Sequence, residues 1–165
     1  MILTGPFIEQ ELHAGRIVIE PFSAEAVNPN SYNYRLGSRL KRYDDAIGEF
    51  VEMQLPEDGY VLTPHRMYLG HTAEIIGSPT YAMSLIGRSS MGRLGLFLQL
   101  SADLGHTTSC HRWTLEIVAT RPIRIYPGMV IGQVSFWRNT GTLKPSPALY
   151  ATFSNPCESR IGAHQ

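Results

Sequence analysis

The sequence has no excess of charge of either sign. Its 165 residues include 14 Lys and Arg against 14 Asp and Glu, so no large net field exists to attract a polyanion. We therefore expect no duplex nucleic acid as a partner. Any phosphate group must be bound by a local site.

Cysteine and long apolar runs are also scarce. The two cysteines, Cys110 and Cys157, cannot form a disulfide framework, and the first residues lack the basic start and apolar core of a signal peptide. No apolar run approaches the roughly 20 residues that a membrane-spanning helix needs. The sequence therefore predicts a cytoplasmic protein that does not bind a membrane.

Short β-favouring runs, mostly bounded by glycine or proline, fill much of the chain. The predicted strands cover residues 17–19, 32–36, 60–62, 67–69, 73–76, 81–86, 96–100, 113–118, 123–126 and 130–137. A short helix is expected over residues 6–14, ending at Gly15. We predict one mostly-β domain, a sandwich or barrel over residues 1–138, with residues 139–165 as its irregular C-terminal arm.

The segment 87–93 combines two glycines, two hydroxyls and two guanidinium groups in the run Gly87-Arg88-Ser89-Ser90-Met91-Gly92-Arg93. Ser89 and Ser90 are suited to cap a short helix, whose free backbone N–H groups favour an anion, while a guanidinium can hold phosphate or carboxylate in a bidentate manner. The pattern indicates a phosphate or carboxylate ligand. The alternative is an ordinary helix start with surface arginines.

A single carboxylate, Glu116, lies in the predicted strand 113–118. Strand alternation places Trp113, Leu115 and Ile117 on one face, and Glu116 on the other face with Thr114 and Val118. A carboxylate among uncharged neighbours tends to have a raised pKa or a cationic partner, and both conditions suit a general acid or base. Arg93 is the expected partner. The alternative is a solvent-facing strand on which Glu116 has no chemical role.

His106, Cys110 and His111 gather in one loop. A zinc site would need a fourth ligand at a defined spacing, and the sequence has no Cys-x-x-Cys pair and no His-x-Glu motif. We therefore expect no metal site and no zinc-dependent deaminase chemistry. A metal-binding loop at these three residues remains the alternative.

Several segments, in order along nearly the whole chain, resemble the dCTP deaminases of the dCTP deaminase and dUTP diphosphatase superfamily. These segments are 15–22, 28–37, the Gly-Arg-Ser-Ser run with the Arg-Leu-Gly-Leu after it, 122–136 and 159–161. The resemblance implies a dUTPase-type fold, a distorted β-barrel or jelly-roll-like structure. It also implies a homotrimer with active sites between subunits, and a C-terminal arm that closes over a pyrimidine nucleotide.

By the same resemblance, Glu116 activates water for attack on C4 of cytosine, and Ser89 and Arg93 assist it. The implied reaction converts dCTP and water to dUTP and ammonia. The residues expected to contact the nucleotide are Arg88, Ser90, His106, Thr114, Gln133 and Tyr150. Mg²⁺ is expected only as a counter-cation of a di- or triphosphate.

The sequence departs from the family pattern where the nucleotide would be held. His106 occupies the position of an Asp that contacts the sugar and activates water in the diphosphatases, which argues against pyrophosphate hydrolysis. Leu149 and Phe153 occupy positions of phosphate-contacting Lys and Gln, and Asn33 replaces an Asp of the first motif. A cytosine-nucleotide deaminase is therefore the first hypothesis. A non-catalytic nucleotide-binding or regulatory member is the second, and a dUTP diphosphatase the third.

Overall fold

The computed structural model describes residues 1–99, 101–144 and 154–159. The helices and strands are, in chain order, α1 (Gly5–His13), β1 (Val18–Glu20), the 3-10 helix η1 (Ala24–Ala26), β2 (Tyr32–Arg35), β3 (Arg39–Asp44), β4 (Glu49–Gln54), β5 (Tyr60–Leu62), β6 (Met67–His71), β7 (Ile75–Gly77), β8 (Tyr81–Gly87), α2 (Ser89–Leu94), β9 (Leu96–Leu98), β10 (Leu104–Gly105), β11 (Cys110–His111), β12 (Thr114–Ala119), β13 (Ile123–Ile125) and β14 (Val130–Arg138). The predicted mostly-β fold with a short N-terminal helix is confirmed.

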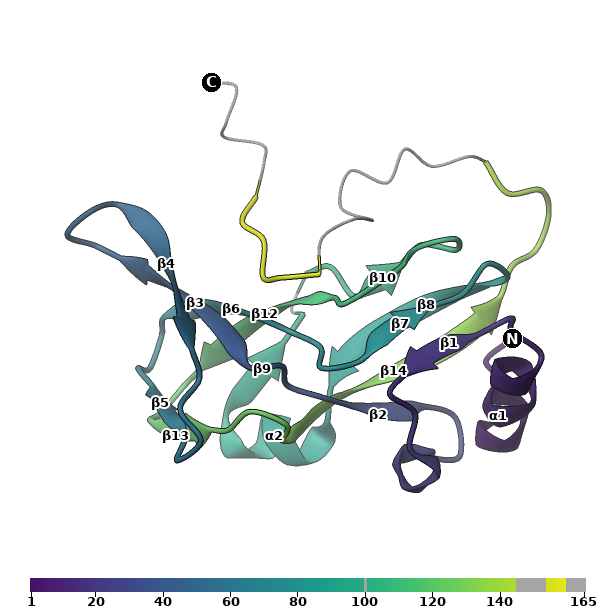
Figure 1. Ribbon diagram of the computed structural model, residues 1–165, viewed down its shortest axis with the longest axis horizontal. Helices are drawn as coiled ribbons and strands as arrows, with labels where there is room; N and C mark the ends of the chain where they lie inside the picture. Colours follow the sequence, from purple (N-terminus) through teal and green to yellow (C-terminus); the bar gives the residue numbers. More distant parts are fainter. Residues whose placement is uncertain (100, 145–153, 160–165) are drawn as a thin grey trace.

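The strands of the described residues form four antiparallel sheets around one core (Figure 1). Their orders are β1-β7-β11, β10-β8-β14-β2, β4-β3-β6-β12-β9 and β13-β5. These pairings describe open sheets, and the core fills the space that they enclose. None of the helices in the described ranges is long and apolar enough to cross a membrane.

Alternating burial along the strands forms that core. In β8, Tyr81, Met83 and Leu85 are buried, and the buried Phe136 lies on the neighbouring β14. A close approach on β14 depends on Gly132, because a Cβ there would lie 2.1 Å from the ring of Tyr34 on β2. Gly132, in the segment 122–136, is therefore required for packing.

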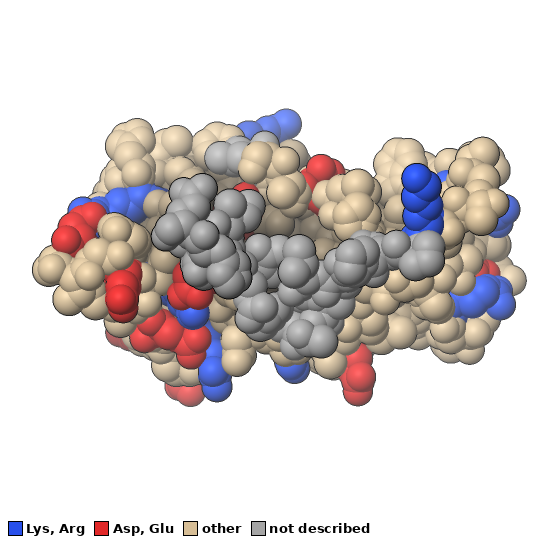
Figure 2. Space-filling model, turned by 90° about the horizontal axis from the view of Figure 1, so that it is seen from above, with Lys and Arg blue, Asp and Glu red and all other residues tan. Residues whose placement is uncertain are grey.

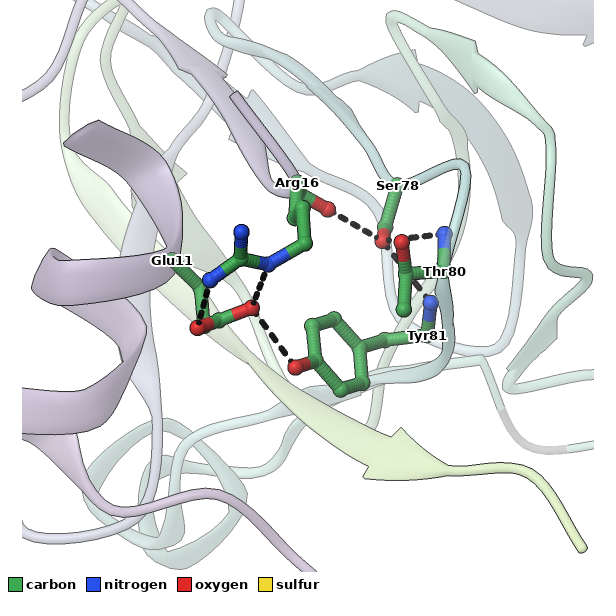
Figure 3. Close-up of polar contacts among 5 residues, drawn as sticks. All are labelled: Glu11, Arg16, Ser78, Thr80 and Tyr81. Carbon is green, nitrogen blue, oxygen red and sulfur yellow. Dashed lines mark hydrogen bonds and ion pairs between the residues drawn. The ribbon is translucent and has the colours of Figure 1, made fainter. Parts of the chain in front are cut away.

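Helix α1 is attached to the sheets by one polar cluster (Figure 3). The buried Glu11 accepts two hydrogen bonds from Arg16, at 2.5 and 2.6 Å, and one from the hydroxyl of Tyr81 at 2.7 Å. Beside them the Ser78 hydroxyl donates to the Arg16 carbonyl at 2.6 Å and accepts from the backbone of Thr80 and Tyr81. The cluster joins α1 to the turn between β7 and β8.

The prediction missed the hairpin of β3 and β4, which projects from the body (Figure 1), and the two-residue strands β10 and β11. It placed the end of β9 too late, because Gln99 has a positive φ of 50° and ends the strand. In the C-terminal arm, residues 139–144 and 154–159 form neither helix nor strand, as predicted.

Candidate active site

Glu116 lies in the middle of β12, between β6 and β9. Leu115 and Ile117 point into the core and are fully buried, whereas Thr114, Glu116 and Val118 are half-buried. The predicted two-faced strand is confirmed, and Glu116 lies on the face that the core does not fill.

Gln99 holds the backbone of Glu116 through two hydrogen bonds. Its N–H donates to the Glu116 carbonyl at 3.2 Å, and its side-chain oxygen accepts from the Glu116 N–H at 2.7 Å. The left-handed backbone of Gln99 turns the chain out of β9. The Gln99 side chain then accepts the Glu116 N–H in place of a backbone carbonyl. Sequence reasoning missed this residue, because only the pairing of β9 with β12 identifies it.

Ser89 and Arg93 lie on α2, which is fixed to the far end of β12. Gly95 ends the helix with a positive φ of 88°, and its carbonyl accepts the Thr120 N–H at 2.9 Å. Arg121 donates to the Leu94 carbonyl at 2.7 Å. The fold thus attaches the segment 87–93 at the end of the strand that carries Glu116.

The N-terminus of α2 differs from the one that the sequence predicts. Arg88, not Ser89 or Ser90, is the N-cap residue, and its side chain makes no capping hydrogen bond. Ser89, Ser90 and Arg93 are exposed at the surface and Arg88 is half-buried. The two serine hydroxyls are therefore not used as helix caps.

The expected pair of Arg93 and Glu116 is not formed within one chain. Over the described ranges, no ion pair includes either side chain. Lys and Arg are interspersed with Asp and Glu on the face of the molecule drawn in Figure 2.

His106 lies at the opposite end of β8 from Ser89. It directly follows Gly105, which pairs with Met83 near the start of β8. Ser89 lies six residues beyond Met83, which at about 3.3 Å per residue is roughly 20 Å. One chain therefore does not bring His106 and Ser89 to a common point.

Two further residues of the expected nucleotide site have protein partners. The Thr114 hydroxyl accepts the Cys157 N–H at 3.2 Å, and the Gln133 side chain accepts from the Ser31 hydroxyl at 3.0 Å. Tyr150, with Leu149 and Phe153, lies outside the described residues. Asn33 is half-buried on β2 and reaches the side chain of Asn28 at 3.5 Å.

The loop of His106, Cys110 and His111 does not gather its three side chains. His111 is buried, bonds the Arg112 carbonyl at 2.8 Å and packs on Trp113 with 4.2 Å between ring centres. Cys110 and His106 are exposed. No group of three His, Cys, Asp or Glu side chains suited to hold a metal ion occurs among the described residues.

Two cavities lie away from Glu116. The larger, of 930 Å³, is lined by residues of the β3–β4 hairpin, β5 and β6. The smaller, of 500 Å³, lies beside Glu11, Arg16 and Tyr81. Neither is lined by Ser89, Arg93 or Glu116.

The comparison with known families identifies the family of this chain. A family model described as dCTP deaminase-like matches residues 2–139. This chain belongs to the dCTP deaminase-like family. The match includes α2, β12 and His106, and it ends where the C-terminal arm begins.

Relatives of this dCTP deaminase-like chain carry deaminase names. The dUMP-forming dCTP deaminases of Clostridium acetobutylicum and Cytophaga hutchinsonii are each 42% identical to it over 142 residues, which is 82% of this chain and 82% of each relative. A dCTP deaminase of Rhodopirellula baltica is 38% identical over 147 residues, covering 86% of this chain and 74% of the relative. The implied enzyme family is therefore confirmed.

A solved structure shares the fold. The 2′-deoxycytidine 5′-triphosphate deaminase of Agrobacterium tumefaciens aligns with a TM-score of 0.69 at 23% identity. The alignment covers 90% of this chain and 51% of that protein, so this chain spans about half its length. At this identity the likeness supports the fold alone.

Proposed function

We propose that the protein is a hydrolytic cytosine-nucleotide deaminase, with dCTP as its substrate. The observation that carries the proposal is the placement of Glu116. In a dCTP deaminase-like fold, Gln99 fixes its backbone on the face of β12 that the core does not fill, and the helix that bears Ser89 and Arg93 is attached at the far end of that strand. A fixed carboxylate that a hydroxyl and a guanidinium join in the assembled site is suited to position and activate water.

In the proposed reaction, the Glu116 carboxylate accepts a proton from water as the water oxygen bonds to C4 of the cytosine ring. The C4=N3 double bond opens as this happens, and the carboxyl passes that proton to N3. Glu116 then takes the remaining proton of the C4 hydroxyl and gives it to the amino group, which leaves as ammonia when the C4–N bond breaks and the C4=O bond forms. Arg93 and Ser89 hold the carboxylate and the water in line. The balanced change is dCTP and water to dUTP and ammonia.

Glu116→Gln tests this role. The amide keeps the shape of the side chain and cannot accept the proton, so ammonia release from dCTP should fall by about a hundredfold or more. Glu25→Gln, which removes a carboxylate from the 3-10 helix η1, is the matched control. Undiminished turnover by the Glu116→Gln variant would refute the assignment.

We further propose that the active site is completed by a second subunit of a homotrimer. Support comes from the roughly 20 Å of strand between His106 and Ser89 and from the unpaired Arg93 and Glu116 of the described single chain. Light scattering should give three chains per particle. If catalytic residues of different chains meet in one site, mixed trimers of Ser89→Ala and Glu116→Gln should regain part of the activity that each variant lacks. A fully active monomer would contradict the shared site.

The nucleotide product of the reaction is either dUTP or dUMP, and we propose dUTP. His106 carries no carboxylate with which to activate water for pyrophosphate hydrolysis, which supports dUTP as the product. The names of the two relatives at 42% identity favour dUMP as the second candidate. Ion-exchange analysis of the nucleotide product, with a parallel pyrophosphate assay, separates the two. Stoichiometric pyrophosphate would overturn dUTP as the final product.

We expect a metal ion only as a counter-cation of the substrate phosphates. Mg²⁺ would accompany the phosphates, and the sequence has no zinc signature to activate water. A zinc-selective chelator should therefore leave deamination unchanged, whereas Mg²⁺ should alter the KM for dCTP. Loss of turnover on zinc removal that added zinc restores would contradict the role given to Glu116.

A further inference from the structure

The C-terminal segment Ser154–Ser159 returns to the sheet that carries Glu116 (Figure 1). Pro156 is buried, and the next N–H, of Cys157, donates to the Thr114 hydroxyl at 3.2 Å. Glu158 then pairs with Lys41 of β3, with 2.7 Å between Nζ and the carboxylate oxygen. The segment is therefore attached at three consecutive residues.

The strand register places this attachment on the same face as Glu116. Leu69 of β6 lies opposite Lys41 of β3 on one side and opposite Glu116 of β12 on the other. Directly opposite residues project to one face of a sheet, so Lys41 and Glu116 share a face at a spacing of two strands, about 10 Å. Thr114 lies on that face too, two residues before Glu116.

The two side chains of this ion pair differ in their exposure to solvent. The Lys41 side chain is 16% exposed, whereas Glu158 is 39% exposed. Lys41 thus belongs to the body of the sheet, and Glu158 is the partner that can leave with its segment. Single hydrogen bonds and partly exposed ion pairs are individually weak, so this attachment suits a segment that opens and closes during turnover.

We propose that Lys41 is a positioning residue, whose ion pair with Glu158 latches the segment Ser154–Ser159 over the face of Glu116 and so strengthens nucleotide binding. The inference rests on the proposed function, because the benefit of the latch is the enclosure of a substrate beside Glu116. The hydrogen bond from the Cys157 N–H to the Thr114 hydroxyl holds the segment against β12. The charge of Lys41 holds Glu158, the next residue of the segment.

Charge reversal provides the test. Lys41→Glu and Glu158→Lys should each raise the KM for dCTP by roughly two- to fivefold, with a smaller change in kcat. The doubly reversed protein should recover the wild-type KM. Lys144→Glu, which makes the same charge change at an exposed lysine of the arm, is the control and should leave the KM unchanged. Lys41→Met keeps the aliphatic stem and should reproduce the effect if Lys41→Glu does not fold.

Hydrogen exchange at the Cys157 amide measures the latch without any nucleotide. This amide should exchange faster in both single variants and return to the wild-type rate in the double variant. Wild-type exchange and an unchanged KM in the single variants would overturn the latch, as would a double variant that recovers neither. If the wild-type protein releases no ammonia, the proposed function fails, whereas the exchange rates still decide whether Lys41 holds the segment.

Discussion

The buried carboxylate of Glu11 should make the stability of the protein depend on acidic pH. Its side chain is 2% exposed and is held by Arg16 and the Tyr81 hydroxyl (Figure 3). The bidentate guanidinium of Arg16 lowers the pKa of Glu11 from 4.5 to about 2, against the opposing effect of burial. The folded state therefore prefers the ionised carboxylate more strongly than the unfolded state does.

The size of the effect follows from linkage between proton binding and folding. The full difference between a pKa of about 2 and one of 4.5 corresponds to about 3 kcal/mol at neutral pH. Because the Arg16 side chain is 48% exposed, solvent screening reduces the expected contribution to about 1–2 kcal/mol. This stability is complete above pH 4.5 and is lost as the pH falls toward 2.

Glu11→Gln isolates the effect. Denaturant unfolding at pH 7 should show the variant to be less stable than wild type by about 1–2 kcal/mol, and the difference should shrink as the pH is lowered to 3. Glu9→Gln, on the same helix and outside the cluster, is the control. A stability difference that is equal at pH 7 and pH 3 would show that shape, not charge, makes Glu11 important.

Substitutions at three other residues should change the stability or the turnover of the protein. Gly132→Ala places a methyl group 2.1 Å from the Tyr34 ring and should lower the free energy of unfolding by about 1–3 kcal/mol in denaturant titrations. Gln99→Ala removes the partner of the Glu116 N–H and should lower kcat for dCTP roughly tenfold with little change in KM. Burial lowers the pKa of His71, so wild-type stability should fall as the pH drops below about 6.5; His71→Gln should show a smaller fall in the same titration.

The strands that the sequence predicted well have apolar residues on every second position. In β8 and β14 the buried side chains alternate with half-buried or exposed ones, and this pattern is visible without a structure. The β3–β4 hairpin lacks it, because charged residues occupy six of its twelve strand positions. Its support comes from cross-strand pairs such as Arg39 with Glu52, at 3.1 Å, and the edge-on rings of Tyr43 and Phe50. Such pairs can be identified only after the register is known.

The residues of the candidate site likewise fall into those that the sequence singled out and those that it missed. Alternation along one strand was enough to predict the face of Glu116, and a linear motif was enough to single out Ser89 and Arg93. Gln99 and Lys41 were missed because their relation to Glu116 runs across strands, through the pairing of β9 with β12 and of β3 with β6. A residue of this kind has no local signature in the sequence.

The distance between Ser89 and His106 bears on which subunits contact the base and the sugar of one nucleotide. The deoxyribose and the base of one nucleotide are directly bonded neighbours, so residues that contact them must lie close together. Ser89 and His106 lie at opposite ends of β8, and that strand keeps them apart in one chain. If both contact the same nucleotide, they come from different subunits. A change at His106 would then alter the contact with the sugar without moving Glu116, so the reaction at the ring and the choice of nucleotide could change independently.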